Sequence, residues 1–273
     1  MKAHLTTRAL LLVAMALPWA APAQLERDPP PPVVEGKDVI WVPTPERVVD
    51  HMLALARVGP RDLVADLGSG DGRIPIAAAK RYGARGLGIE YSAALVAASR
   101  RNAHDEGVAD RVRFVQADLF EADFRDATVV TLYLLSSLNV KLRPKLLDMK
   151  PGTRVVSHVF RMGDWEPDET QKVGSSELFL WRVPARVAGR WRLTVAGGAP
   201  LEIAFDQRFQ ELSGRAVAAG RGFPLRAARL AGEEIRFAFT DAHGVAQAFA
   251  GRVAADRMAG ADGGWRAVRL GAH

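Results

Sequence analysis

A glycine-rich loop between carboxylates is the segment of this sequence with the clearest chemistry. Residues 66–73 read Asp-Leu-Gly-Ser-Gly-Asp-Gly-Arg. The apolar run 63–67 before the loop predicts a strand, and the Ala-rich run 74–82 after it predicts a helix. Glycines let the backbone turn sharply and approach a ligand closely, and the amino terminus of a helix adds free N–H groups. The segment therefore predicts a small-molecule binding site.

The spacing of the glycines distinguishes between nucleotide cofactors. A dinucleotide site has the pattern G-x-G-x-x-G, whereas glycines here occupy every second position from Gly68 to Gly72 and Arg73 follows. Asp66 and Asp71 are unfavourable neighbours for a pyrophosphate. They favour a ligand with a cationic amine and a sulfonium, because opposite charges attract. The loop therefore predicts S-adenosylmethionine rather than NAD or FAD.

Two further acids stand at the ends of predicted strands. Glu90 ends the apolar run 86–90, and Asp118 ends the run 112–118. Open α/β sheets bind ligands at the carboxyl ends of their parallel strands. In such a site Glu90 can accept hydrogen bonds from ribose hydroxyls, and Asp118 can accept one from the adenine amino group.

Strands and helices must alternate to bring these acids together, and residues 40–160 have that pattern. The predicted strands are 63–67, 86–90, 112–118, 128–135 and 154–160. The predicted helices begin at Thr44-Pro45 with Thr44 as N-cap, at Ile74, after Ser92 and at Asn139 as N-cap. This alternation predicts an α/β fold with a doubly wound, mostly parallel sheet over residues 39–185.

The pattern changes after residue 185. Short segments of alternating polarity lie between glycine-rich turns, at 190–195, 201–209, 225–230, 234–239, 246–253 and 265–270. Strands at this spacing predict a smaller antiparallel β-rich domain over residues 186–273, either a sheet or a small barrel.

The first 38 residues predict a targeting segment and a linker. Lys2 and Arg8 precede nine apolar residues, Ala9 to Leu17, and a small-residue run that ends at Ala23. This order is typical of a secretory signal peptide with cleavage after Ala23, and nine residues are too few to cross a bilayer. Residues 24–38 are proline-rich and predict an extended linker. We expect a periplasmic or exported protein, or alternatively a membrane-tethered one with an uncleaved N-terminus.

Composition excludes several classes of protein. The 273 residues contain no cysteine, which excludes a disulfide framework, a Cys-ligated metal and cysteine catalysis. The formal net charge is +6, and residues 186–273 hold 13 Arg against 8 acidic residues. We therefore expect an anionic envelope surface or partner to bind this C-terminal part. The six histidines have no metal-ligand spacing, so no metal site is predicted.

Over roughly residues 39–183 the chain resembles the class I, seven-strand S-adenosylmethionine-dependent methyltransferases. It is more closely similar to the mitochondrial protein-lysine methyltransferases and their bacterial relatives, through Pro43-Thr44-Pro45, Val48-Val49-x-x-Met52-Leu53, the loop 66–73 and Thr131-Leu132-Tyr133-Leu134. The resemblance implies N-methylation of protein lysine. It also implies that Asp66, Gly68, Gly70 and Asp71 line the methionine end of the cofactor and that Thr44 helps to close the cofactor site. The cofactor-binding candidates are Thr44, Asp66, Gly68, Ser69, Gly70, Asp71, Gly72, Glu90, Tyr91, Asp118 and Leu119.

Candidates for the reaction itself follow the fourth and fifth predicted strands. Tyr133 can point its ring and hydroxyl at an acceptor amine, or can simply pack in a central strand. His158, Asp164 and Trp165 are further candidates, with core packing or a lid as alternatives for His158 and Trp165. Methyl transfer mainly needs alignment and exclusion of water, so no acid/base pair is required.

Several functions remain open at this level. The same fold could methylate a small molecule or a lipid head group. The chain could also be a non-catalytic S-adenosylmethionine-binding envelope protein, or an adhesion protein that depends on its C-terminal part. Nucleic acid is disfavoured as a substrate because the fourth strand lacks the Asn-Pro-Pro-aromatic motif of base amino-methyltransferases.

Overall fold

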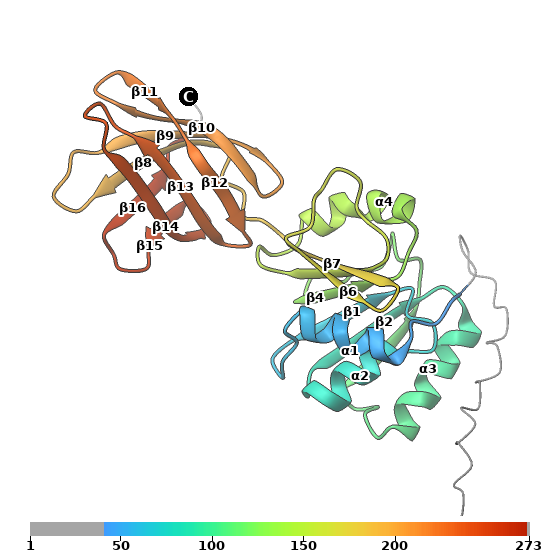
Figure 1. Cartoon of the computed structure of the whole chain (residues 1–273). Helices are drawn as coiled ribbons and strands as arrows, with labels where there is room; N and C mark the ends of the chain where they lie inside the picture. Colours follow the sequence, from blue (N-terminus) through green and yellow to red (C-terminus); the bar gives the residue numbers. More distant parts are fainter. Residues whose placement is uncertain (1–40, 272–273) are drawn as a thin grey trace, which may run out of the picture. The chain divides into compact units, whose positions relative to one another are not determined.

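The computed structural model describes residues 41–271, which form two β-sheets and four helices (Figure 1). The predicted signal peptide and proline-rich linker lie outside the described residues, so both stay predictions.

The first sheet has seven strands, of which five build a parallel core. In spatial order they are β3 (Val112–Gln116), β2 (Arg85–Glu90), β1 (Leu63–Leu67), β4 (Val129–Leu132), β5 (Arg154–His158), β7 (Ser176–Arg182) and β6 (Glu169–Val173). The first five strands run parallel, whereas β7 is antiparallel to both β5 and β6. The predicted mostly parallel α/β sheet is confirmed.

Helices cover both faces of this sheet (Figure 1). They are α1 (Glu46–Leu55), α2 (Arg73–Tyr82), α3 (Ala93–Asp105) and α4 (Ser136–Leu147). Successive strand residues point to opposite faces, so Val64 packs in the cluster with α1 and α2 while Ala65 packs in the cluster with α4. Because both faces are covered, the central strands are mostly apolar, and polar residues such as Asp66 and Thr131 lie toward their carboxyl ends. Their carboxyl ends, together with the loops that follow, are left to form a binding edge.

Two of the three predicted N-caps are wrong, and tertiary contacts explain both. Pro45, not Thr44, occupies the N-cap position of α1, without a side-chain cap bond. Helix α4 starts at Ser136, and Asn139 lies fully buried inside it, where its amide binds the segment after β5. The third prediction is confirmed: Ser92 caps α3 by accepting a bond from the backbone N–H of Leu95.

The second sheet closes on itself as an antiparallel barrel. Its strands are β8 (Gly189–Val195), β9 (Leu201–Arg208), β10 (Glu211–Ala218), β11 (Arg221–Pro224), β12 (Arg226–Ala231), β13 (Glu234–Thr240), β14 (Ala246–Ala254), β15 (Arg257–Gly260) and β16 (Trp265–Arg269). Pairing of β9 with β10 joins the two ends of the ladder. The interior is filled by aromatic residues such as Phe237, Phe249 and Trp265, whose rings lie 5.0–5.9 Å apart.

The β-rich C-terminal prediction is therefore confirmed, although three strands were not anticipated. These are β10, β11 and β15. Each contains glycine, at Gly214, Gly222 and Gly260, which interrupts the alternation of polar and apolar residues. At Gly214 and Gly260 a Cβ atom would collide with neighbouring atoms, so close packing inside the barrel requires these glycines.

Candidate functional site

A pocket opens at the carboxyl edge of β1, β2, β3 and β4. Ten of its lining residues were predicted from the sequence: Thr44, Asp66, Gly68, Ser69, Asp71, Glu90, Tyr91, Asp118, Leu119 and Tyr133. Gly70 and Gly72 belong to the same loop but do not line the pocket. The parallel topology thus brings together acids that lie up to 52 positions apart in the chain.

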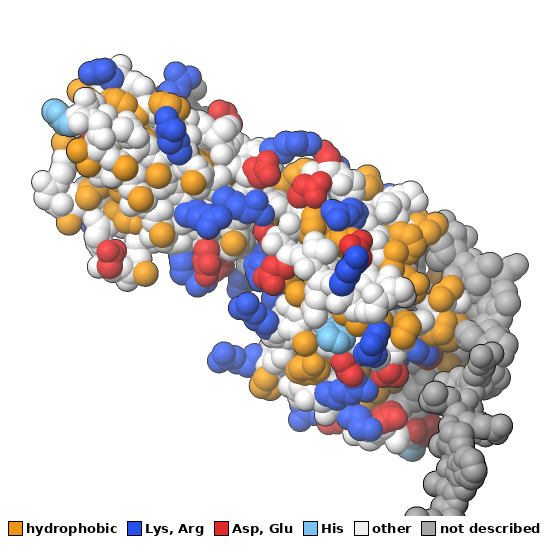
Figure 2. All heavy atoms as spheres, viewed as in Figure 1, with side chains coloured by type: hydrophobic (Ala, Val, Ile, Leu, Met, Phe, Trp, Pro, Cys, Tyr) orange, Lys and Arg blue, Asp and Glu red, His pale blue; other side chains and the backbone are white. Residues whose placement is uncertain are grey.

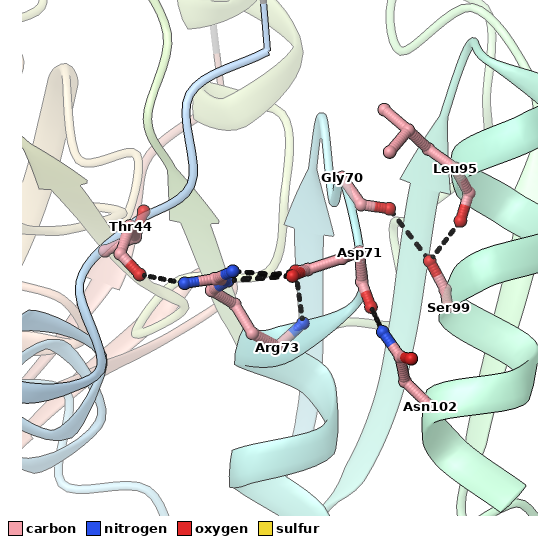
Figure 3. Close-up of polar contacts among 7 residues, drawn as sticks. All are labelled: Thr44, Gly70, Asp71, Arg73, Leu95, Ser99 and Asn102. Carbon is pink, nitrogen blue, oxygen red and sulfur yellow. Dashed lines mark hydrogen bonds and ion pairs between the residues drawn. The ribbon is translucent and has the colours of Figure 1, made fainter. Parts of the chain in front are cut away.

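The glycine loop is shaped by close approaches on its two sides. At Gly70, φ is +54° and a side chain would overlap the Trp41 ring; at Gly72, φ is +83° and a side chain would overlap Phe114. Helix α3 holds the loop from behind (Figure 3): the Ser99 hydroxyl lies 2.8 Å from the Gly70 carbonyl, and the Asn102 amide donates to the Asp71 carbonyl at 2.9 Å. Glycine is therefore required by both conformation and space.

Asp66 lies at the base of the pocket, where it is only 4% exposed. It accepts a 2.6 Å hydrogen bond from the Thr131 hydroxyl of the neighbouring strand β4. Burial raises the pKa of Asp66 to about 7: desolvation of the carboxylate is the largest cause and outweighs the Thr131 bond, and repulsion from the nearby Asp71 and Glu90 adds to the rise. A cationic ligand bound beside Asp66 would stabilise the ionised form of its carboxylate.

Glu90 joins the glycine loop to the start of α3. Its two carboxylate oxygens accept from the backbone N–H groups of Gly70 and Ser92, each at 2.9 Å. Each oxygen keeps a second lone pair that can accept from a ribose hydroxyl. Asp118 turns the chain after β3 by accepting from the Phe120 N–H at 2.9 Å, and it lines the same pocket.

Arg73 is a pocket residue that sequence reasoning did not assign to the site. Its guanidinium binds Asp71 through two side-chain bonds, 2.9 Å from Nε and 2.6 Å from Nη2, and donates from Nη1 to the Thr44 carbonyl at 2.8 Å (Figure 3). The charge of Asp71 is thus balanced within the protein, so Asp66 and Glu90 remain for the cations of a ligand. The sequence signal for Arg73 as a site residue was its place directly after the third glycine of the loop.

The segment before α1 also lines the pocket. Trp41, Val42 and Pro43 were not predicted as site residues, and they lie beside Thr44 along one wall. Apolar side chains that sequence reasoning missed as site residues complete the lining: Ile74, Ile89, Leu95, Ala117, Leu134 and Leu138. A tryptophan just before a Pro-Thr-Pro sequence was the only local signal for this wall.

Tyr133 and His158 lie together at the β4 end of the pocket. Tyr133 lines the pocket, and its ring centroid is 4.1 Å from that of His158. His158 is buried, its Nε2 lies 2.9 Å from the Ser176 hydroxyl, and burial lowers the pKa of His158 below its ordinary value. The imidazole is therefore neutral at pH 7, which suits a site for a cationic or amine ligand.

Asp164 and Trp165 do not reach the pocket, so their predicted role in the reaction finds no support. Asp164 forms ion pairs with Arg143 and Arg208. The Trp165 ring is fully buried, donates from Nε1 to the Gln210 amide oxygen at 2.8 Å and stacks near Phe209. These contacts join the first sheet to the barrel, which is a structural role.

The strand order assigns parts of a ligand to parts of the pocket. Along the edge β3-β2-β1-β4, Asp118, Glu90 and Asp66 occur in the order expected for adenine, ribose and the methionine cation. Tyr133, directly after β4, lines the same pocket. The buried, unneutralised Asp66 fits the amine and sulfonium of S-adenosylmethionine. Within residues 41–271, no cluster of His, Cys, Asp or Glu could hold a metal ion, and no helix is long and apolar enough to cross a bilayer. The fold and site define a class I, S-adenosylmethionine-dependent methyltransferase.

Comparison with known proteins narrows this class. Residues 66–169 match the family model described as "ANTKMT methyltransferase domain". A protein-lysine N-methyltransferase of Saccharolobus islandicus is 46% identical over 142 residues, which cover 51% of this chain and 88% of that protein. An adenine nucleotide translocase lysine N-methyltransferase of Mus musculus is 34% identical over 147 residues, which cover 53% of this chain and 63% of that protein. The chain belongs to the family of protein-lysine N-methyltransferases.

A solved structure is also similar to about half of the chain. It is described as an RNA methyltransferase from Salinibacter ruber in complex with S-adenosyl-L-homocysteine. It is 56% identical to this chain, with a TM-score of 0.53, over 54% of this chain and 96% of that one. The S-adenosyl-L-homocysteine bound in this relative agrees with S-adenosylmethionine as the cofactor.

Proposed function

We propose that this protein transfers a methyl group from S-adenosylmethionine to the side-chain amine of lysine in another protein. One observation carries the proposal: Tyr133, Leu134 and Leu138, which follow β4, add a largely apolar wall to the pocket that Asp66 also lines. An amine attacks only as the neutral form, and an apolar wall favours that form because burial lowers the pKa of an ammonium group. The kinship with protein-lysine N-methyltransferases supports the same conclusion.

The reaction is an in-line displacement that needs alignment more than acid/base catalysis. The lone pair of the lysine nitrogen forms the new N–C bond, while the S–CH₃ bond breaks and its electron pair returns to sulfur. The amine's extra proton then leaves to solvent. Asp66 and Glu90 orient the cofactor, while Tyr133 and Leu134 exclude water from the acceptor path. This positioning raises the rate by holding the reacting atoms in a near-attack geometry.

The test is methyl transfer by the full chain into bacterial extract, with tritiated S-adenosylmethionine as donor. Label should survive ribonuclease, disappear with protease, and map by mass spectrometry to methylated lysine. Label removed by ribonuclease would instead favour RNA, the substrate class named for the Salinibacter ruber relative. Label in small molecules or lipids would favour the alternative acceptors, and cofactor binding without any label would favour a binding protein.

We also propose that the protein is exported, as the sequence of residues 1–23 suggests. Mass measurement of the mature N-terminus in fractionated cells tests this: a periplasmic chain that starts after Ala23 supports it. A full-length chain in the cytoplasm would contradict it.

The barrel offers a basic outer face for an anionic envelope partner. Strand register places Arg257 beside Val268, and Val268 beside Arg192, on the outer face of β15, β16 and β8. Figure 2 shows basic side chains projecting from the barrel at several places. Co-sedimentation with vesicles containing anionic phosphatidylglycerol, at low and high salt, tests the proposal. Binding lost in Arg192→Gln/Arg257→Gln supports it, and equal binding to neutral vesicles contradicts it.

A further inference from the structure

The chain makes an unusual turn directly after β5, beside the acceptor end of the pocket. Val159 has φ +67°, a conformation that β-branched residues rarely adopt. The Val159 N–H donates to the Glu177 carbonyl at 2.7 Å, and the Phe160 N–H donates back to the His158 carbonyl at 2.8 Å. Strained backbone of this kind persists only where surrounding structure enforces it, and it clusters at functional sites.

Two buried polar side chains enforce the turn. The Phe160 carbonyl accepts from the Ser157 hydroxyl at 2.6 Å and from the Asn139 amide at 3.2 Å. The Asn139 amide also lies 3.3 Å from the Ser157 hydroxyl. Both side chains are fully buried, so their bonds have no competition from water. The position of Phe160 is therefore determined by α4 and β5 together.

The turn places the Phe160 ring beside Tyr133, a residue that lines the pocket. Its centroid is 6.0 Å from that of Tyr133, which lines the pocket and also lies against His158. Phe160 is half-buried, so part of its ring remains accessible. Aromatic faces attract ammonium groups, and the neutral His158 ring adds no opposing charge.

We propose that Phe160 and Tyr133 form an aromatic wall that holds the methylammonium forms of the acceptor lysine between transfers, with Asn139 and Ser157 as positioning residues. This inference rests on the proposed function and assigns its acceptor subsite. Cation–π attraction would hold a partly methylated lysine at the site between transfers. The wall therefore favours the addition of more than one methyl group to the same lysine.

A binding experiment tests the wall without relying on activity. The full chain is loaded with S-adenosyl-L-homocysteine and titrated with the peptide acetyl-Gly-Lys(trimethyl)-Gly-amide. Its neutral analogue, in which carbon replaces the quaternary nitrogen, is titrated in parallel. We expect the cation to bind about fivefold more tightly than the neutral analogue. Phe160→Leu should abolish this preference and Phe160→Tyr should keep it.

Matched controls separate the wall from general damage. Phe223→Leu removes another half-buried ring, in the barrel, and should leave the preference unchanged. All variants should keep the wild-type affinity for S-adenosyl-L-homocysteine. Equal binding of the two peptides by the wild-type chain, or an unchanged preference in Phe160→Leu, would overturn the proposal.

The positioning role has its own signature. Asn139→Ala and Ser157→Ala should weaken the preference for the cation, and Asn139→Ala should have no further effect on it when Phe160 is already Leu. Additive effects would contradict the positioning role. Wild-type protein that prefers the cation but methylates no lysine would overturn the proposed function alone. Lysine methylation with unchanged KM and product distribution in Phe160→Leu would overturn the wall alone.

Discussion

Asp66 at the end of β1 and Thr131 on β4 share a 2.6 Å hydrogen bond, although 65 positions separate them in the chain. Thr131 is fully buried, so Asp66 has one strong internal donor and little water. This single bond does not offset the desolvation, which is why the pKa of Asp66 rises to about 7. The carboxylate is thus placed to bind a cation, and burying it in the ionised form lowers the stability of the folded protein.

Replacement of Asp66 should weaken cofactor binding and raise the stability of the fold. An ordinary Asp ionises near 3.8 in the unfolded chain and near 7 in the folded one, so ionisation on raising the pH favours unfolding. The free energy of unfolding should therefore fall between pH 4 and pH 7, by at most roughly 4 kcal/mol from this group. Asp66→Asn should remove this fall and raise the Tm at pH 8, while weakening cofactor binding at least about tenfold. Thermal melts and calorimetry measure the two effects; a lower Tm at pH 8 would contradict the assignment.

The same titration predicts how cofactor affinity depends on pH. The cationic cofactor prefers the ionised carboxylate, so the affinity of the wild-type protein should rise from pH 6 to pH 8 as Asp66 loses its proton. The Asp66→Asn protein should show a flat profile over this range. Titration calorimetry with S-adenosyl-L-homocysteine checks the prediction, because its amine stays protonated over most of the range. A wild-type profile as flat as that of the variant would show that ionisation of Asp66 does not control cofactor affinity.

Gly70 and Gly107 form a matched pair that tests whether crowding by Trp41 requires a glycine in the loop. Both have positive φ, but a side chain at Gly70 overlaps Trp41, whereas one at Gly107 meets nothing within 4 Å. Gly107→Ala should cost about 1–2 kcal/mol of stability and leave cofactor binding intact. Gly70→Ala should weaken cofactor binding severely at similar stability, measured by calorimetry and chemical denaturation. Equal binding by the two variants would show that Trp41 does not limit the loop.

Arg73 connects the glycine loop to the segment before α1. Arg73→Met should release the Thr44 carbonyl and leave Asp71 without its ion pair. We expect faster hydrogen exchange over residues 41–48 and about tenfold weaker cofactor binding. Arg81→Met, which removes exposed ion pairs with Glu46 and Asp50, is the control and should change neither quantity. Unchanged exchange in Arg73→Met would mean that the segment is held by its apolar contacts.

Trp165 and Tyr133 should respond differently to truncation. Trp165→Phe leaves the buried Gln210 oxygen without its donor, which costs about 1–3 kcal/mol of stability. Its kcat at a temperature where the protein is folded should equal the wild-type value. Tyr133→Leu should instead lower kcat/KM at least about tenfold with a smaller loss of stability. A large loss of kcat in folded Trp165→Phe would restore Trp165 as a candidate for the reaction.

The cofactor half of the site could be predicted from the sequence because its signals are local. Asp66, Glu90 and Asp118 each follow an apolar strand, and parallel strands bring their carboxyl ends to one edge by topology alone. Arg73 and Trp41 were missed because their roles depend on contacts with segments about 30 positions away. Sequence pattern carries no information on such contacts.

The acceptor half was decided by the tertiary structure. Asn139 has the residue type of a helix cap, yet it lies inside α4 because its amide is needed by the Phe160 carbonyl. Trp165 follows the fifth strand almost as closely as Phe160 does, yet it turns into the join with the barrel. The sequence by itself determined the alternation of strands and helices, the cofactor class and the acids that bind it, since these follow from periodicity and charge. Only the tertiary structure decided that the Phe160 ring lies beside Tyr133, because bonds from Asn139 of α4 and Ser157 of β5 to the Phe160 carbonyl hold the turn at Val159.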